Sequence, residues 1–380
     1  MSKRKKDLPV SDLDQKNKIE DPRTWAKTKI SFLSRLSAKD KIVFFKYLAV
    51  MIDAGTPLEK GLIAIHNQTR SSLMHKILHI ILTDVASGEF LSTSLKKMPQ
   101  LFDPMSISLI TVGENSGTLS QSLLRIGEQI EKSQELKHKI QGALLYPIIV
   151  VVATSGIAAY LLLVLLPQIT PLFASLNVKI PWTTQVVVAS SSFVLHYGLY
   201  LLLGIAAIVV AGTFALRIQK IRFLFDSILL RMPVAGPLIK QVQIAQFARI
   251  LGTLLKSGIT IIEALSIAGT SLSNMIYKQT LFAMSREIQN GSNISTHLFS
   301  KRKLFPPFIT QMISMGEETG KLDDSFLFVA EFAEREVDDA TKTLTTILEP
   351  LLMLAIGGLV GFIAIAIITP IYQLTSGIKY

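Results

Sequence analysis

Two short segments of the sequence contain residue types and spacings that could do chemistry. His75 and His79 lie four residues apart, which places two metal ligands on one face of a helix, but neither a glutamate in the zinc-protease position nor a third ligand accompanies them. The segment Thr319-Gly320-Lys321-Leu322 resembles part of a phosphate-binding loop, but it lacks the upstream glycine and the Ser/Thr after the lysine, and no strand precedes it. Because the sequence also has no cysteine, we expect no catalytic, cofactor or metal site.

A Gly-Glu-x-x-Gly-x-Leu pattern occurs twice in the chain. Its residues are Gly113, Glu114, Gly117 and Leu119 in the first copy and Gly316, Glu317, Gly320 and Leu322 in the second. Because the pattern lies between two amphipathic segments, we expect its second glycine to form a turn with a positive φ. The glutamate has two interpretations: it accepts hydrogen bonds from free amides at the start of the next helix, or it is exposed at a surface that binds a partner.

The two copies of this pattern belong to a longer internal repeat. Glycines and prolines recur at one constant offset in residue number, as Gly55 and Gly258, Gly88 and Gly291, Pro104 and Pro307, Pro147 and Pro350, and Pro167 and Pro370. A register without gaps over this length indicates a duplication, and we call this constant spacing the repeat offset. Each unit is predicted to be a helical domain followed by one membrane span that begins and ends at a proline.

Helical periodicity dominates the two repeated domains, and no strand-like alternation interrupts it. Ser37-Ala-Lys-Asp40 has the form of a capping box, so order is predicted to begin there. We predict an all-α membrane protein with cytoplasmic helical domains at residues 37–146 and 246–346, each of about six helices. Residues 1–36 combine basic residues with prolines, which predicts a flexible cytoplasmic tail with a short helix near Trp25 to Leu36.

Three apolar segments are long enough to cross a bilayer, because a hydrocarbon core about 30 Å thick requires roughly 20 residues of helix. We place the spans at residues 147–168, 184–216 and 347–373, joined by an external loop at 169–183 and a juxtamembrane connector at 217–245, with an external C-terminus at 374–380. The first span includes nineteen consecutive residues without a charge or a histidine. The middle span has no counterpart in the repeat, so it is predicted to return the chain between two parallel units.

An odd number of spans places the two termini on opposite faces of the membrane. Basic residues are dense in the N-terminal tail and around the second domain, including Arg217, Lys220, Arg222 and Lys342, whereas Lys179 and Lys379 are the basic residues of the other face. The positive-inside rule then places the N-terminus and both helical domains in the cytoplasm and the C-terminus outside. This topology accounts for the net charge of +11, so nucleic-acid binding is not expected.

Glu349 is an acidic residue directly beside a predicted span, where the first repeat has the uncharged Tyr146. One account is local: a carboxylate near a helix start is stabilised by free amides and by the helix dipole. The other account is that Glu349 pairs with a cationic group in the protein interior or on a bound partner, because unpaired charge at membrane depth is costly. Both accounts remain open from the sequence.

The residues around the first span resemble those of a known family. The segment Lys139-Ile-Gln-Gly-Ala143-Leu144-Leu-Tyr146-Pro147, with Thr154, Leu161 and Leu165-Leu166-Pro167, closely resembles the signature of the type II secretion F and type IV pilus assembly C proteins. The resemblance covers about residues 37–375 and includes the duplicated domain, the paired turns and the closing Pro370-Ile371-Tyr372. The second copy departs from the signature, with Thr343, Thr346 and Glu349 where the first has Ile140, Ala143 and Tyr146.

The resemblance implies an inner-membrane platform protein without catalysis of its own. Similar proteins couple a cytoplasmic assembly ATPase to the extraction of pilin or pseudopilin subunits from the bilayer, together with other inner-membrane assembly proteins. The resemblance also implies a homo-oligomer, which the Gly357 and Gly361 pair of the third span supports, because small residues four apart let helices approach closely. Membrane lipid is a further expected partner.

Two other classes of protein compete with this interpretation. A small transporter with repeated halves would place polar or charged groups near the bilayer midplane, whereas these spans offer only serines, threonines and His196. A membrane-anchored enzyme would need a constellation of acid, base or nucleophile, which the sequence does not present.

Overall fold

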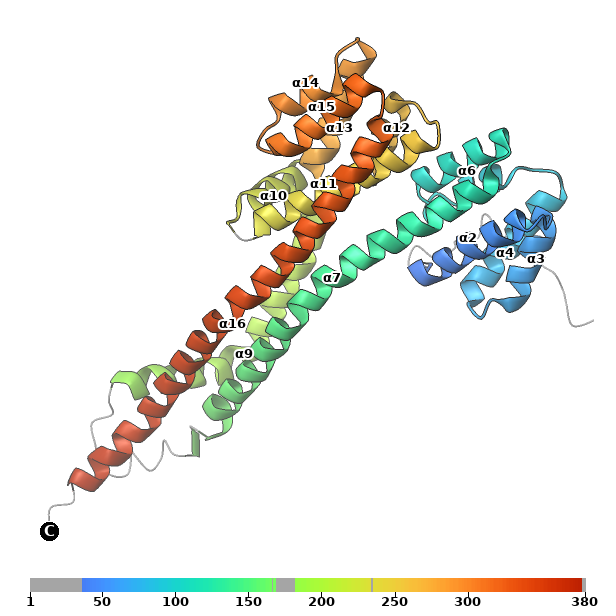
Figure 1. Cartoon of the computed structure of the whole chain (residues 1–380). Coiled ribbons are helices and arrows are strands. Elements are labelled where there is room, and N and C mark those ends of the chain that lie inside the picture. The colour runs from blue at the N-terminus through green and yellow to red at the C-terminus, as the bar shows by residue number, and fades with distance from the viewer. Residues whose placement is uncertain (1–35, 166, 169–181, 234, 378–380) are drawn as a thin grey trace, which may run out of the picture. The chain divides into compact units, whose positions relative to one another are not determined.

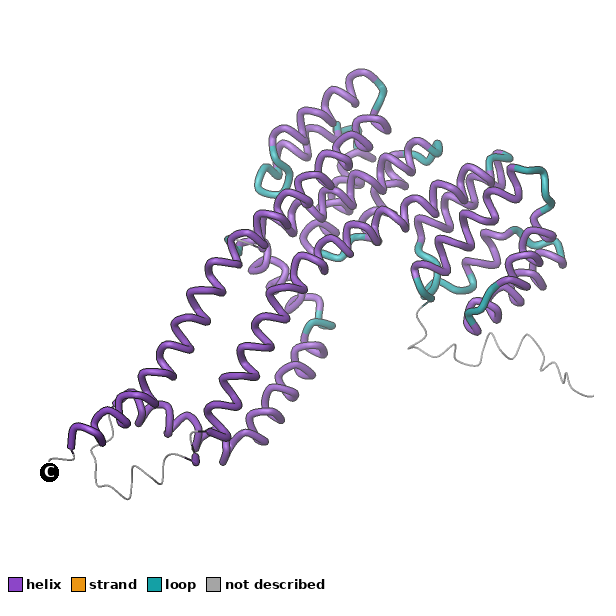
Figure 2. The backbone as a smooth tube through the Cα atoms, turned by 60° about the horizontal axis from the view of Figure 1, so that its bottom comes forward, coloured by secondary structure: helices purple, strands orange, loops and turns teal. Residues whose placement is uncertain are grey.

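The computed structural model describes residues 36–165, 167–168, 182–233 and 235–377. Figure 2 shows helices joined by short loops, with no strand in the described ranges. The chain divides into two compact units, Met1–Glu131 and Lys132–Tyr380. The all-α fold class predicted from the sequence is confirmed.

In the described residues, six helices begin in the first unit. They are α2 (Ala38–Asp53), α3 (Leu58–Gln68), α4 (Ser72–Ala86), α5 (Leu91–Lys96), α6 (Pro104–Ser116) and α7 (Leu119–Tyr160), and the later part of α7 belongs to the second unit. Their apolar faces enclose a core in which Phe44, Phe45 and Phe102 are almost completely buried. The rings of Phe44 and Phe45 are 4.9 Å apart between centroids, a distance at which aromatic pairs stabilise a core.

Local capping residues explain where these helices start and stop. The Ser37 hydroxyl accepts a hydrogen bond from the Lys39 amide at 3.3 Å, and the Asp103 carboxylate accepts one from the Ser106 amide at 3.0 Å. Each satisfies an amide that has no partner within its own helix. The helix expected near Trp25 to Leu36 lies, except for its last residue, outside the described residues.

The second unit contains an equivalent bundle of six helices. They are α11 (Ala235–Lys256), α12 (Ile261–Ser271), α13 (Met275–Gln289), α14 (Ile294–Ser300), α15 (Pro307–Thr319) and the first part of α16 (Leu322–Gly377). Phe247, Tyr277, Phe305 and Phe326 form its aromatic core and are all fully buried. The prediction of about six helices in each domain is confirmed.

The helices of the two bundles correspond residue by residue. Three pairs of helices begin and end at positions that differ by the repeat offset: α3 and α12, α4 and α13, and α6 and α15. The first residues of α7 and α16 differ by the same offset. The same offset relates the buried Phe44 to Phe247 and Phe102 to Phe305. Six glycines with positive φ form three pairs at this offset, at residues 55 and 258, 88 and 291, and 117 and 320. The duplication predicted from the sequence is therefore a duplication of structure.

The connector before the second bundle is itself helical. Helix α10 (Gln219–Arg231) is followed directly by α11, which begins at Ala235 and so includes residues that we assigned to the connector. The chain breaks between these two helices, and Gly236 and Pro237 lie in the first turn of α11. Proline is tolerated there because the first amides of a helix have no partner within it.

Three helices are long and apolar enough to cross a membrane. They are α7 with the short π-helix η2 (Leu161–Leu165), the part of α9 (Trp182–Ala215) from His196 onward, and α16. Figure 1 shows α16 running without interruption from the second bundle into its apolar part. Each repeat thus ends in one continuous helix that serves both as the last helix of a bundle and as a candidate membrane segment.

Candidate functional site

The glycines of the repeated motif have two separate structural roles. Gly117 and Gly320 end α6 and α15 in the left-handed conformation, with φ of 72° and 70°, as expected for the second glycine. The first glycine, at 113 and 316, lies where two helices approach closely. A Cβ atom on Gly113 would be 2.5 Å from the Ser122 hydroxyl oxygen, so a side chain there would force α6 away from α7. The sequence pattern predicted a role for the second glycine only.

The motif glutamates bind the start of a short helix. Glu114 accepts hydrogen bonds from the Leu91 and Ser92 amides of α5 at 2.6 and 3.1 Å, through one carboxylate oxygen each. The free amides are therefore those of a helix that lies earlier in the chain, and the expectation that they belong to the next helix is wrong. The contact links the last turn of α6 to the start of α5 within the same bundle.

Glu317 repeats this arrangement in the second bundle. It accepts from the Ile294 and Ser295 amides of α14 at 2.7 and 3.1 Å, and from the Ser295 hydroxyl at 2.7 Å. A carboxylate at a helix N-terminus also interacts favourably with the helix dipole. Leu119 and Leu322 are the first residues of α7 and α16, so each copy of the motif ends where the long helix of its repeat begins.

A second repeated contact, which the sequence analysis missed, joins the first and last helices of each bundle. The Lys46 ammonium lies 2.6 Å from a Glu131 carboxylate oxygen, and Arg249 makes two hydrogen bonds with Glu334, of 3.0 and 2.8 Å. The repeat offset relates Lys46 to Arg249 and Glu131 to Glu334, so the two ion pairs occupy equivalent positions. Opposite charges recurring at that offset were a signal in the sequence that could have revealed the contact.

The prolines do not mark helix starts. Pro147 lies inside α7, and Pro350 and Pro370 lie inside α16, so each helix passes through the expected boundary of its span without a break. Pro167 follows η2. A proline inside a helix removes one backbone hydrogen bond, a change that membrane helices accommodate through neighbouring helices and local adjustments of the backbone. The prolines are therefore not helix boundaries, and where each span enters and leaves the membrane stays a prediction.

Glu349 lies in the interior of α16 with an exposed side chain. The helix begins many turns earlier, at Leu322, so Glu349 has no free helix-start amides near it. The local account of this carboxylate is therefore wrong. Among the described residues no ion pair includes Glu349.

The apolar helices contact one another through backbone carbonyls. The Thr184 hydroxyl of α9 donates to the Ala366 carbonyl of α16 at 2.6 Å, and the Ser191 hydroxyl donates to the Leu162 carbonyl of η2 at 2.6 Å. Val187 is buried between these contacts. Hydroxyl groups that are satisfied in this way can join apolar helices without leaving a polar group in lipid.

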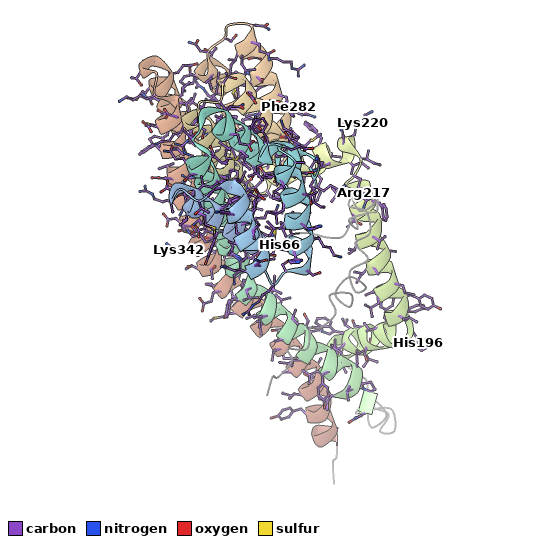
Figure 3. The ribbon with its side chains drawn as sticks, turned by 90° about the vertical axis from the view of Figure 1, so that its right-hand side faces the viewer. His66, His196, Arg217, Lys220, Phe282 and Lys342 are labelled. Carbon is purple, nitrogen blue, oxygen red and sulfur yellow. The ribbon has the colours of Figure 1, made fainter. Side chains whose placement is uncertain are left out.

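Helix α9 changes direction close to His196 (Figure 3). Just before that point the hydroxyls of Ser190 and Ser192 donate to the Val186 and Ala189 carbonyls. Serines that bond back to their own helix commonly bend it. Helix α9 therefore packs against α16 and η2 with its first part and continues with its second part as an exposed apolar helix.

Most apolar side chains of the spans are exposed in the single chain. Examples are Ile149 at 57%, Leu202 at 68% and Leu354 at 78% exposed. Gly357 and Gly361 of α16 leave open space where a Cβ atom would stand. Such surfaces suit lipid or another apolar helix.

The histidines near α4 form a stack. The rings of His66 and His75 are 3.8 Å apart between centroids, and His79 lies farther from His66, at 6.4 Å. Within the described ranges no three His, Asp or Glu side chains are arranged to hold a metal ion.

Comparison with known proteins identifies the family. The model of type II secretion system (T2SS) protein F matches residues 44–167 and again residues 247–370. The chain belongs to the type II secretion system protein F family. The repeat offset found in the sequence and in the helices also separates the starts and the ends of these two matches.

Relatives of this family include proteins of two machines. The type IV pilus assembly protein PilC of Myxococcus xanthus is 35% identical over 344 residues, which cover 90% of this chain and 82% of that protein. The PilC protein of Pseudomonas aeruginosa is 33% identical over 345 residues, covering 90% and 91%. Type II secretion system protein F of Vibrio cholerae is 30% identical over 346 residues, covering 91% and 85%. The resemblance stated from the sequence is thus confirmed.

Proposed function

We propose that this chain is the inner-membrane platform of a type IV pilus or type II secretion machine. In this role it couples a cytoplasmic assembly ATPase to the extraction of pilin or pseudopilin subunits and to fibre assembly. The observation that carries the proposal is the double family match over both repeats, together with relatives named for both machines.

The architecture supports a mechanical rather than a catalytic role. Each repeat joins a helical bundle to an apolar helix through one continuous helix, α7 or α16. A helix that continues from a bundle into an apolar segment connects the two mechanically, because its backbone hydrogen bonds hold it together on both sides of the interior proline. A motor that moves a bundle would therefore move the attached span, and the exposed apolar faces of the spans offer a surface for the apolar stem of a pilin.

The proposal can be tested with the purified chain in lipid nanodiscs. We expect no ATP hydrolysis by the chain alone, binding of the cognate assembly ATPase, and a changed rate of ATP hydrolysis by that ATPase once it is bound. In cells, deletion of the gene should abolish pilus assembly or secretion. ATP hydrolysis by the chain alone at rates typical of a motor, or normal assembly and secretion in the deletion strain, would contradict the proposal.

Glu349 is the candidate contact within this function. Since the interior of α16 provides no free amides, we propose that its carboxylate pairs with a cationic group of a bound pilin, of another assembly protein or of a second copy of the chain. We expect Glu349→Gln to insert normally and to abolish assembly, measured as surface pili or secreted substrate.

The matched control for Glu349→Gln is Asp339→Asn, which removes a carboxylate from the same helix. Asp339 forms an exposed pair with Lys342 at 3.6 Å, and exposed pairs contribute about 0–1 kcal/mol, so assembly should remain normal. Wild-type assembly in Glu349→Gln would exclude a functional role for its charge.

A further inference from the structure

Helix α10 presents an apolar stripe that no described part of the chain covers. The stripe consists of residues spaced three or four apart, Ile218, Ile221, Leu224, Phe225, Ile228 and Met232, which are between 41% and 61% exposed. At 3.6 residues per turn these positions share one face. A set of this size on one face is more than the single scattered apolar residues that occur on ordinary surfaces.

The opposite face of α10 is attached to the second bundle by specific contacts. The Asp226 carboxylate accepts a hydrogen bond from the Met275 amide, at the start of α13, at 2.7 Å. The Arg222 guanidinium donates to the Ser273 carbonyl at 2.7 Å, and Leu230 is buried. These contacts fix the rotation of α10 about its own axis, so the apolar stripe must point away from the bundle.

The position of α10 along the chain limits what the stripe can meet. Only three residues, Leu216 to Ile218, separate the last residue of α9 from the first residue of α10. A fully extended connection of that length spans roughly 14 Å. Since the candidate membrane span of α9 ends at Ala215, α10 starts within that distance of the end of the span.

The charges of α10 match those of an anionic lipid surface. Arg217, Lys220, Arg222 and Arg231 oppose the single carboxylate of Asp226 over residues 217–231, a net charge of +3. Arg217 and Lys220 lie at the end of α9 that is distant from His196 (Figure 3). Lys220 and Arg231 border the apolar stripe on one side, where long cationic side chains can reach headgroups while the apolar residues enter the acyl boundary.

We infer that α10 is an interfacial helix, which lies in the membrane surface with its apolar stripe among the lipids and its cations on anionic headgroups. Because its other face is attached to α13, this helix fixes the second bundle against the membrane. The inference requires that α9 spans the membrane, and it is independent of the proposed role in pilus assembly or secretion.

The absence of cysteine from the chain makes this inference directly testable. Single cysteines at Leu224→Cys and Ile228→Cys, in the full chain, are labelled with a nitroxide and reconstituted in phosphatidylethanolamine vesicles that contain phosphatidylglycerol. Collision of the label with oxygen, which concentrates in lipid, is compared with collision with a water-soluble nickel complex. We expect the ratio of the oxygen collision rate to the nickel collision rate to be several-fold higher at residues 224 and 228 than at the control Met315→Cys. Met315 is an exposed apolar residue of α15.

Two results would overturn the inference. Equal ratios at Leu224→Cys and Met315→Cys would mean that the stripe faces water, and low collision with both reagents would mean that a protein covers it. Charge reversal at Lys220→Glu and Arg231→Glu tests the headgroup contact, since the oxygen preference of the label at residue 224 should then fall. An unchanged preference would overturn the electrostatic part of the inference. All five substituted positions are exposed, so each variant should keep its fold, which circular dichroism checks.

Discussion

The Glu317 carboxylate accepts three hydrogen bonds from the first residues of α14. Substituting alanine leaves the Ile294 and Ser295 amides without this acceptor in a partly buried place. An unsatisfied group of that kind costs about 1–3 kcal/mol. We therefore expect Glu317→Ala to accelerate hydrogen exchange of the α14 amides by about 5-fold to 150-fold, measured by mass spectrometry on the full chain in detergent.

The neighbouring Glu318→Ala is the control for this prediction. Glu318 is exposed, and within the described ranges it accepts a single hydrogen bond, from the Ser314 hydroxyl at 3.3 Å. Its removal should leave exchange in α14 unchanged. Equal exchange rates in the two variants would show that the Glu317 contact does not stabilise the bundle.

Tyr277 makes the second bundle sensitive to high pH. Burial raises the pKa of its hydroxyl above the ordinary value, because the charged form loses its hydration. The unfolded chain therefore releases this proton first, at about pH 10. The stabilisation that Tyr277 provides is complete below that pH and is lost as the pH rises above it, by about 1.4 kcal/mol per pH unit.

Tyr277→Phe should remove this loss. At neutral pH the variant lacks the hydrogen bond from the hydroxyl to the Leu304 carbonyl, of 2.8 Å, so it should be about 1 kcal/mol less stable. Above about pH 10 the free energy of unfolding of the wild type should fall towards that of the variant. Urea unfolding in mild detergent, followed by circular dichroism, measures both. Tyr47→Phe is the control, since Tyr47 is 51% exposed. If the free energies of unfolding of Tyr277→Phe and wild type ran parallel against pH, the burial of Tyr277 would not be the cause of the loss at high pH.

Single residues show how far the sequence could be interpreted. The positive φ at Gly117 and Gly320 follows from local rules, because only glycine adopts that conformation without strain. The partners of Glu114 and Glu317 depend on which helix folds back against the turn, which is a tertiary contact between residues 22 or 23 positions apart. Local sequence could indicate that these carboxylates bind helix-start amides, but it could not indicate which helix.

At the scale of whole helices, boundaries set by caps and glycines were predictable, and those set by the membrane were not. Ser37 begins α2 because its hydroxyl satisfies an amide of the first turn. Pro147 and Pro350 signal helix breaks in water, yet α7 and α16 continue through them. In an apolar environment an interrupted helix would expose more polar backbone than the single bond that proline removes, so continuity is favoured.

The paired ions that close each bundle differ in strength between the two repeats. The side chains of Arg249 and Glu334 are 15% and 22% exposed and form two parallel hydrogen bonds, whereas Lys46 and Glu131 are 31% and 44% exposed and form one. A half-exposed pair contributes about 0–1 kcal/mol, and breaking a well-buried pair costs about 3–5 kcal/mol. We expect Glu334→Gln to destabilise its bundle by about 2 kcal/mol, and Glu131→Gln to destabilise its own by less than about 1 kcal/mol.

Hydrogen exchange resolved by helix separates these two effects. Amides of α11 report on Glu334→Gln, and amides of α2 report on Glu131→Gln. Asp324→Asn is the control, because its pair with Lys256 is 3.4 Å long and the aspartate is 62% exposed. If Glu131→Gln accelerated exchange in α2 as much as Glu334→Gln does in α11, burial would not be the cause of the difference.

At the scale of the whole molecule, the duplication constrains the topology. Two parallel units, each a bundle followed by a span, require one return helix between them, and α9 is the apolar helix in that position. The basic residues of α10 follow α9 directly, so the same charges that suit an anionic lipid surface also favour the cytoplasm for that end of α9. Both bundles would then lie on the cytoplasmic side, where an assembly ATPase could reach them.

This topology predicts the activity of reporter fusions along the chain. Alkaline phosphatase, which is active only outside the cytoplasm, should be active when fused after residue 175 or at the C-terminus, and inactive after residue 280. A reporter active only in the cytoplasm should give the reverse pattern, which controls for differences in expression. If alkaline phosphatase were active at all three positions, α9 would not return the chain across the membrane, and the second bundle could not share a compartment with the first.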